Sequence, residues 1–330
     1  MSCPFRFTYL VFALLFVVTA CNTPDPEFSA PLISERVSFT ATRQYPEGIT
    51  YAPLFSQFLV SSITQGKVGI VDQNGRYNDL IADDRQLISS IGMKVQNNLL
   101  YVCNGDQGVS TKSTPQTTLK TAGLFIYDLR TLKNIRRVNL AALRPSTENH
   151  FANDIALDPN GTAYVTNSFA PIIYKVPADS TQQITIINSP LFAGGEGFNL
   201  NGIVYHPNNY LIVVKSNEGK LFKIDLKNPN TITEVAGVSL PQGDGMLLYN
   251  NDLYVVNNQN QVSQVRSSDD WKTAVIVKTD AVGYSEATTN VLVDTKIYTL
   301  NARIGEVSAA VSAKDPTRLQ ANGYSIEQFK

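Results

Sequence analysis

A strand-turn-strand pattern recurs along this chain, and an internal repeat constrains a fold more than any single motif does. In each copy a polar or glycine residue precedes a hydrophobic run, a turn interrupts the run, and a second strand follows. The clearest copies are residues 154–165, 202–214 and 245–256, and weaker copies are residues 48–60, 92–102 and 287–300. Six copies of one unit therefore span most of the chain.

The spacing of the copies identifies the unit. The clear copies begin at Asp154, Gly202 and Gly245, which lie 48 and 43 residues apart, as expected for four-stranded propeller blades. Helical periodicity is nearly absent, and segments rich in Val, Ile and Tyr alternate with turns of Asn, Asp, Gly and Pro. We predict an all-β chain, a six-bladed β-propeller of four-stranded blades. A β-sandwich is the alternative, but it does not explain the repetition.

Two further expectations concern the outside of the propeller. Residues 37–43 should supply the outermost strand of the last blade beside residues 324–329, because this pairing closes the ring and covers its edges. The long insertion at residues 109–121 is rich in Ser and Thr and is expected to be a surface loop.

The amino-terminal segment is typical of a secreted bacterial lipoprotein. Arg6 precedes an apolar run at residues 7–18, which is shorter than the about 20 residues that a membrane-spanning helix needs. The sequence Val-Thr-Ala-Cys ending at Cys21 resembles a lipobox, in which the Cys is acylated and becomes the first mature residue. The alternative is a plain signal peptide that is cleaved nearby.

This interpretation sets the domain boundaries and the location. We expect a lipoprotein signal peptide at residues 1–20, a tether from lipidated Cys21 at residues 21–36, and the propeller at residues 37–330. The lipid anchor predicts attachment to a membrane of the bacterial cell envelope. Asn22 stands where an Asp would retain the protein at the inner membrane, so the outer membrane is favoured.

Charge and cysteine content exclude several classes of function. The formal net charge is -1, and the chain has no basic cluster, which argues against a nucleic-acid partner. Cys3 leaves with the signal peptide and Cys21 carries lipid, so Cys103 alone remains in the mature body. We therefore expect no internal disulfide, and Cys103 is interpreted as a small core residue.

Polar residues stand just before four of the predicted innermost strands. Innermost strands line the central channel of a propeller, so these side chains should converge at one end of it. The four residues are Glu47, Asn153, Asn201 and Asp244. Two carboxylates and two amide carbonyls suit a divalent cation, most simply Ca²⁺, with Mg²⁺ and Mn²⁺ as alternatives. The set lacks His and Cys, which disfavours zinc. The alternative interpretation is that these residues only satisfy backbone groups at strand starts.

These positions carry a family resemblance. The segments Glu47-Gly48, Asn153-Asp154, Asn201-Gly202-Ile203 and Asp244-Gly245-Met246 resemble the four metal-binding signatures of the six-bladed SMP-30/gluconolactonase propellers, relatives of the paraoxonases and squid-type phosphotriesterases. The resemblance covers the whole mature body and is clearest from Asn153 to Asp244. It implies that all four residues ligate a divalent cation, and that Asp244 also acts as general base on water.

The implied activity is hydrolysis of a small-molecule lactone or other ester. A cation polarises the carbonyl and stabilises the developing oxyanion, while a carboxylate takes a proton from the attacking water. Sugar-lactonase members often carry an Arg two residues before the first Asn ligand. Here that substrate-binding position is Phe151, which indicates a less polar pocket.

Three further residues or motifs bear on catalysis. His150 is a candidate proton shuttle at the channel mouth, the alternative being a loop histidine that packs on its neighbours. Glu286 is a candidate substrate-binding residue at the same rim, the alternative being a solvated carboxylate. A Ser-His-Asp hydrolase is disfavoured, because the chain lacks a Gly-x-Ser-x-Gly motif and has only two histidines.

Two classes of function follow. The first is a metal-dependent hydrolase of lactones or other esters. The second is a non-catalytic propeller that binds a sugar, a peptide or a protein partner and uses a cation only to hold its blades together. The fold alone does not choose between them, because propellers support many functions.

Overall fold

The computed structural model describes Met1 and residues 33–330 of the chain. Apart from Met1, the predicted signal peptide lies outside these residues, and so does Cys21. Ile33 is already buried against the core, and the first strand, β1, spans Arg36–Thr40. Among the residues described, no helix combines the length and the apolar character that crossing a membrane requires.

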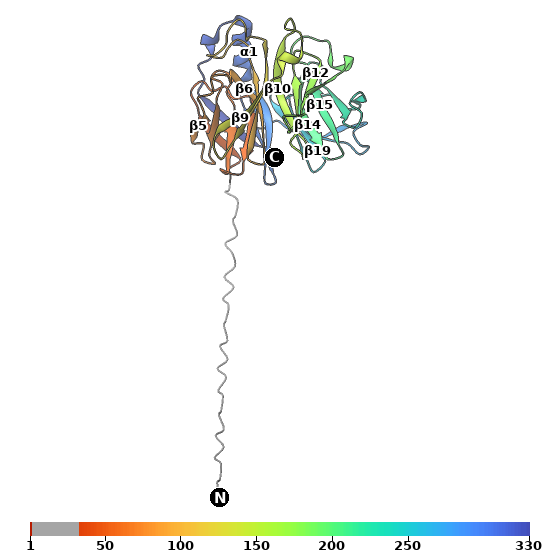
Figure 1. Cartoon of the computed structure of the whole chain (residues 1–330), viewed down its shortest axis with the longest axis horizontal. Coiled ribbons are helices and arrows are strands. Elements are labelled where there is room, and N and C mark those ends of the chain that lie inside the picture. Colours follow the sequence, from red (N-terminus) through yellow and green to blue (C-terminus); the bar gives the residue numbers. More distant parts are fainter. Residues whose placement is uncertain (2–32) are drawn as a thin grey trace. The chain divides into compact units, whose positions relative to one another are not determined.

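Between residues 33 and 330 the chain forms five β-sheets (Figure 1). Four of them are four-stranded, and three of these four are built from consecutive antiparallel strands. The first sheet contains β2 (Ile49–Ala52), β3 (Gln57–Val60), β4 (Val68–Val71) and β5 (Tyr77–Ile81). The second contains β14 (Leu200–His206), β15 (Tyr210–Lys215), β16 (Lys220–Asp225) and β17 (Ile232–Val235). The third contains β18 (Met246–Tyr249), β19 (Asp252–Asn257), β20 (Gln261–Arg266) and β21 (Val275–Asp280).

A fourth sheet has eight strands and consists of two antiparallel groups of four. One group contains β6 (Ser89–Gln96), β7 (Leu99–Gly105), β8 (Lys120–Asp128) and β9 (Lys133–Asn139). The other contains β10 (His150–Leu157), β11 (Ala163–Asn167), β12 (Ile172–Val176) and β13 (Thr185–Asn188). The groups are joined only where β10 runs parallel to β8, through His150 beside Lys120 and Phe151 beside Thr121.

The fifth sheet joins the two ends of the described chain. Its strand order is β1, β24 (Gly323–Gln328), β23 (Lys296–Asn301) and β22 (Ala287–Val293), and β1 pairs with β24 from Arg36 beside Glu327 to Thr40 beside Gly323. The predicted closure is therefore confirmed, because the amino-terminal strand covers the outer edge of the last sheet.

The first strands of these four-strand groups form the centre of the propeller. β2, β6, β10, β14, β18 and β22 contact one another in this order, and β22 contacts β2. Glycine allows the close approach, since a Cβ atom at Gly48 would lie 2.2 Å from the Ile91 carbonyl oxygen and one at Gly202 would lie 2.2 Å from that of Asp244. The chain is thus an all-β propeller with four-stranded blades, as predicted.

One α-helix departs from the expectation that helical structure is nearly absent. α1 (Ile304–Ala313) follows β23 and buries Val307 and Ala310 in the core. It is preceded by Arg303 at φ 59° and followed by Lys314 at φ 51°, both left-handed. The helix escapes the repeat pattern because it is an insertion between two strands of one blade. Short 3₁₀ helices occur at η1 (Ala141–Leu143), η2 (Pro190–Phe192) and η3 (Pro316–Arg318).

The predicted surface loop at residues 109–121 is a loop over most of its length, since β8 begins at Lys120. It is held down more firmly than its composition indicates. Val109 is 3% exposed, and the Lys112 ammonium donates to the carbonyl oxygens of Gly66 and Leu87 at 2.8 and 3.0 Å. The loop begins two residues after Gln107, which lines the central pocket.

Candidate metal centre and pocket

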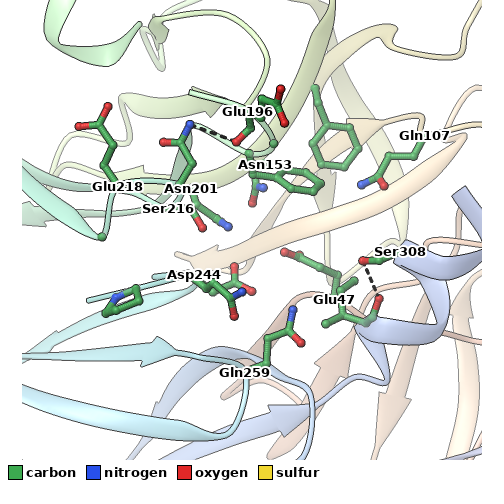
Figure 2. A pocket seen from close by; sticks show the side chains of 18 of the residues that line it. Glu47, Gln107, Asn153, Glu196, Asn201, Ser216, Glu218, Asp244, Gln259 and Ser308 are labelled. Carbon is green, nitrogen blue, oxygen red and sulfur yellow. Dashed lines mark hydrogen bonds between the residues drawn. The ribbon is translucent and has the colours of Figure 1, made fainter. Parts of the chain in front are cut away.

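All four predicted ligands line one pocket of about 480 Å³ (Figure 2). Figure 2 shows Glu47, Asn153, Asn201 and Asp244 pointing into a common space from different strand groups. The first two residues belong to segments more than 100 residues apart in the sequence, and only the propeller brings them together.

β-Bulges direct two of these side chains toward the channel. The pairing of β10 with β11 shifts register between Ala152 and Ile155, and the pairing of β14 with β15 shifts between Leu200 and Ile203. Asn153 and Asn201 are the first extra residues of these bulges, and a bulge re-aims the side chain that it releases from the ladder.

Glu47 and Asp244 occupy the matching position in their own blades. Each lies two residues before the first paired residue of its inner strand, which is Ile49 in β2 and Met246 in β18. The remaining inner strands, β6 and β22, carry Ile91 and Thr288 at this position, within bulges of the same kind. Four of the six matching positions therefore supply carboxylate or amide oxygens. Ile91 has no side-chain oxygen, and the Thr288 hydroxyl is used within the chain, since it donates to the Glu47 carbonyl oxygen at 2.6 Å.

The oxygen atoms that these residues present to the pocket have no hydrogen-bond partner in the described part of the chain. They are Glu47 Oε2, Asn153 Oδ1, Asn201 Oδ1 and Asp244 Oδ1, and all four atoms are buried. Buried polar atoms are almost always paired, because leaving one unpaired costs about 1–3 kcal/mol. Four unpaired oxygens in one pocket therefore indicate a ligand that the chain itself does not supply.

Hydrogen bonds orient the Asn153 carboxamide. Its Nδ2 donates to Ser168 Oγ at 2.9 Å, and that hydroxyl donates to the Leu200 carbonyl oxygen at 2.8 Å. With the nitrogen held in this way, Oδ1 faces the pocket. The adjacent Asp154 has a different role, since its Oδ1 accepts from the Ile155 N–H at 2.8 Å and its Oδ2 from the Ile203 N–H at 3.3 Å. Asp154 thus ties β10 to β14 beneath the pocket.

The electrostatics of the site favour a bound cation. Burial raises the pKa of Glu47 well above its usual value, and the nearby carboxylates of Asp244 and Asp154 raise it further. Burial also raises the pKa of Asp244 to about 8, with Asp154 adding to the effect and a hydrogen bond from the Asn201 side chain opposing it. A divalent cation between the carboxylates would offset this repulsion.

The donor set fits the expected cation. It contains two carboxylates and two amide carbonyls. Within residues 33–330, three or more His, Cys, Asp or Glu side chains are nowhere grouped so that they could bind a metal by themselves. Neutral amide oxygens and carboxylates are the ligands that Ca²⁺ accepts readily, whereas zinc prefers His and Cys. The ligand role of each residue stays a prediction.

The raised pKa values predict how pH affects the protein without divalent cations. Carboxyl groups of the unfolded chain lose their protons near pH 4, whereas folded Glu47 and Asp244 retain theirs to higher pH. Between about pH 4 and about pH 8 the folded state holds more protons, so its stability falls as the pH rises. Thermal unfolding with chelator or with Ca²⁺ should therefore differ more at pH 8 than at pH 5. A stabilisation by Ca²⁺ that is equal at both values would contradict this.

Phe151 lines the pocket, as predicted, and forms an aromatic wall with two other phenylalanines. Its ring centroid lies 5.9 Å from those of Phe169 and Phe198, which are 5.2 Å from each other. Phe198 also lines the pocket. The position that carries an Arg in many sugar lactonases is therefore part of an apolar surface.

His150 is not among the residues that line the pocket, so the proposed proton shuttle is not placed at the channel mouth. It is 2% exposed, its Nδ1 lies 3.0 Å from Asn167 Nδ2, and burial lowers its pKa. Side chains alternate along a strand, so His150 shares the face of Ala152, which packs in the core. The bulge at Asn153 does not redirect it.

Glu286 is also absent from this pocket and lies beside Arg303 and Glu306 in a different pocket of about 670 Å³. The position in β22 that matches the four ligands is Thr288, two residues further along the chain. Glu286 belongs instead to the preceding turn, where its φ is 54°. In the sequence, the sixth copy of the repeat begins at residue 287, and Glu286 was therefore wrongly placed at the rim of the pocket.

Several pocket residues were not identified from the sequence. Ser216, Asn217 and Glu218 lie between β15 and β16, Gln259 lies between β19 and β20, and Gln107 lies between β7 and β8. All of these loops join the second strand of a blade to the third. Because that loop lies at the end where the inner strand begins, the repeat could have indicated these loops but not which of their side chains face inward.

Comparison with known proteins supports the fold. No protein-family model matches the chain, and neither does any curated protein sequence. Among solved structures, the Malassezia sympodialis allergen Mala s 1 matches with a TM-score of 0.69 and 15% identity over 90% of this chain and 96% of the allergen. The calcium-binding protein regucalcin from Agrobacterium tumefaciens matches with a TM-score of 0.60 and 14% identity over 90% and 95%.

A gluconolactonase from Xanthomonas campestris also matches, with a TM-score of 0.57 and 13% identity over 91% of this chain and 93% of that protein. The chain therefore has the fold of the SMP-30/gluconolactonase-like propellers, as the signatures predict. Identities this low concern the fold and leave the activity to be argued from the site.

Proposed function

We propose that this protein is a divalent-cation-dependent hydrolase of lactones or other esters that acts in the central pocket. One observation carries the proposal, namely the four buried and unpaired oxygens of Glu47, Asn153, Asn201 and Asp244 in a single pocket. Similar folds in a calcium-binding protein and a gluconolactonase are consistent with it.

We also propose that the propeller has six blades. The two groups of the eight-stranded sheet are joined by only two residue pairs between β8 and β10, and each group contains four antiparallel strands. Counting them as separate blades gives each of the six inner strands its own blade.

The residues of the chain divide the work of such a site. Glu47, Asn153, Asn201 and Asp244 would hold the cation, which supplies Lewis-acid polarisation of a carbonyl oxygen when it is bound. Asp244 is partly exposed, whereas Glu47 is 7% exposed. A water molecule can therefore approach Asp244 more easily, so this carboxylate is the better acceptor for the proton of that water. The aromatic wall of Phe151 and Phe198 excludes bulk water from one side.

The second candidate is a non-catalytic binding propeller with a structural cation. It is favoured by the origin of the four oxygens, because each lies in or just before a different inner strand, and a cation would link these four strands. Both functions predict cation binding, so only turnover distinguishes them.

A screen tests the hydrolase directly. The soluble chain from residue 22 onward, supplied with Ca²⁺, Mg²⁺ or Mn²⁺, should hydrolyse at least one lactone, aryl ester or phosphotriester, and a chelator should abolish turnover. A catalytic rate that survives complete metal removal would contradict the proposed mechanism. Tight cation binding without turnover on any substrate class would favour the structural role.

The proposed location rests on the sequence. We propose that acylation of Cys21 anchors the protein to a membrane of the bacterial cell envelope, at the outer membrane. The support is the apolar run that ends at Val-Thr-Ala-Cys and the Asn22 that follows. The net charge of -1 accords with a small-molecule substrate rather than nucleic acid.

A further inference from the structure

The charge of the central pocket is one-sided. No Lys, Arg or His is among the described residues that line it, whereas four carboxylates are: Glu47, Asp244, Glu196 and Glu218. Lys94, which favours ionisation of both Glu47 and Asp154, lines a different pocket with residues from later parts of the inner strands. A ligand in the central pocket therefore meets acidic and amide side chains together with the aromatic wall.

One of the four carboxylates has a basic partner in the structure, and two more would be neutralised by the proposed cation. Glu47 and Asp244 would face a divalent cation, and Glu218 forms an ion pair with the buried ammonium of Lys215, whose side chain is 1% exposed. Glu196 is different, because none of the ion pairs among the described residues includes it. One carboxylate charge thus remains at the pocket rim even when the cation is bound.

The loop that carries Glu196 is built to hold it there. Gly194, Gly195 and Gly197 have φ values of 87°, 80° and 83°, a conformation that other residues rarely adopt. Asn217 Nδ2 donates to the carbonyl oxygens of Gly194 at 3.1 Å and Glu196 at 3.3 Å. Beneath the loop, Lys215 Nζ donates to the Ala193 carbonyl oxygen. Figure 2 shows Glu196 at the rim of the pocket, above Asn153 and Asn201.

Aromatic rings line the same pocket as this carboxylate. Phe198, two residues after Glu196, lines the pocket and packs on Phe151 with 5.9 Å between ring centroids. The face of an aromatic ring attracts an ammonium group, and a nearby carboxylate adds to that attraction. An anionic substrate would find no basic side chain among the described residues of this pocket. Only the bound cation could attract it, and the two carboxylates that hold the cation offset its charge, so a sugar acid or a phosphorylated compound is disfavoured.

We infer that the pocket selects an ester or lactone that carries an ammonium group on an apolar scaffold, with Glu196 as the specificity-determining residue. The inference rests on the proposed function for the reaction, but it concerns charge selection, which can be measured without turnover. Hydrolysis converts the ester group of such a substrate into a carboxylate and an alcohol. The acidic rim then repels the new carboxylate and assists release of the product.

Three probes of similar size test the inference by calorimetric titration of the Ca²⁺-loaded protein. They are benzyltrimethylammonium, benzyl alcohol and phenylacetate. The ammonium should bind at least about 10-fold more tightly than phenylacetate, and salt should weaken its binding. Equal affinity for the ammonium and the carboxylate would overturn the inference.

A pair of variants assigns the effect to Glu196. Glu196→Gln should weaken binding of the ammonium about 2- to 5-fold, as for an exposed charge pair, and should change benzyl alcohol binding less than 2-fold. Glu234→Gln is the matched control, because Glu234 lies in the outer strand β17 and its side chain is 46% exposed. An equal effect of both variants, or none from Glu196→Gln, would remove Glu196 from the role.

These experiments distinguish a failure of the proposed hydrolase from a failure of the proposed charge selection. Ammonium selectivity that depends on Glu196, without hydrolysis of any ester, would contradict the hydrolase and retain the charge selection. Hydrolysis of neutral esters without preference for the ammonium probe would contradict the charge selection and retain the hydrolase.

Discussion

Replacement of Asp244 by Asn is expected to lower ester or lactone turnover by at least about 10²-fold, the usual cost of losing a general base. The variant keeps the shape of the side chain and one oxygen, but it removes a negative charge from the cation site. It also places a second amide nitrogen near the Asn201 side chain, which hydrogen-bonds to the Asp244 carboxylate. Cation affinity should therefore fall as well. Paired metal titration and turnover measurements check both effects.

The fold should survive this substitution, because the blades do not depend on one axial carboxylate. A thermal unfolding curve establishes this, and Asp294→Asn serves as the matched control. Asp294 is an exposed residue in the turn between β22 and β23 with φ 54°, a conformation that Asn adopts readily. Unchanged turnover in Asp244→Asn with weaker metal binding would mean that the cation is structural. If neither property changes, Asp244 belongs to no metal site.

Asn201→Asp is the opposite change at the same site. It adds a negative charge beside two existing carboxylates, so the affinity for a divalent cation should rise while the apo protein becomes less stable at neutral pH. A lower affinity for the cation would indicate that Asn201 Oδ1 does not face it.

Substitution of Cys21 is expected to have an all-or-none effect on lipid attachment. If Cys21 is acylated, Cys21→Ala should abolish metabolic labelling with fatty acid and release the protein from membranes, because stable anchoring requires several acyl chains. Cys3→Ala is the control, since Cys3 lies in the predicted signal peptide and its loss should leave labelling intact. Persistent labelling of Cys21→Ala would refute the lipoprotein interpretation, and a secreted but unlabelled wild type would favour a plain signal peptide.

The repeat in the sequence was sufficient to predict the all-β propeller and the position in the chain where each inner strand begins. Strands with a period of two, tight turns and a polar residue before the first buried position are local features, and local features are encoded in neighbouring residues. This is why Glu47, Asn153, Asn201 and Asp244 could be chosen from residues far apart in the chain, and why all four line one pocket. The strand that closes the last sheet was predictable for the same reason.

The failures occurred where a position depends on register or on packing. His150 and Glu286 lie within three residues of a ligand or of its structural equivalent, yet neither lines the central pocket. One is turned into the core by strand alternation, and the other precedes the bulge by two residues. Likewise α1, which supplies Ile304 and Ser308 to the pocket, carries no repeat signal because it is an insertion.

The amino-acid sequence alone therefore determined the fold class, the repeating unit and the residues at the inner strand starts, because each depends on local periodicity. Only the tertiary structure decided which of their atoms lack partners. The Asn153 amide nitrogen is held by Ser168, whereas both Asp154 oxygens accept backbone N–H groups. It also decided that Glu196 is the rim carboxylate without an ion pair, because Lys215 reaches Glu218 instead. Hydrogen-bond and charge partners come from distant blades, so no local sequence pattern specifies them.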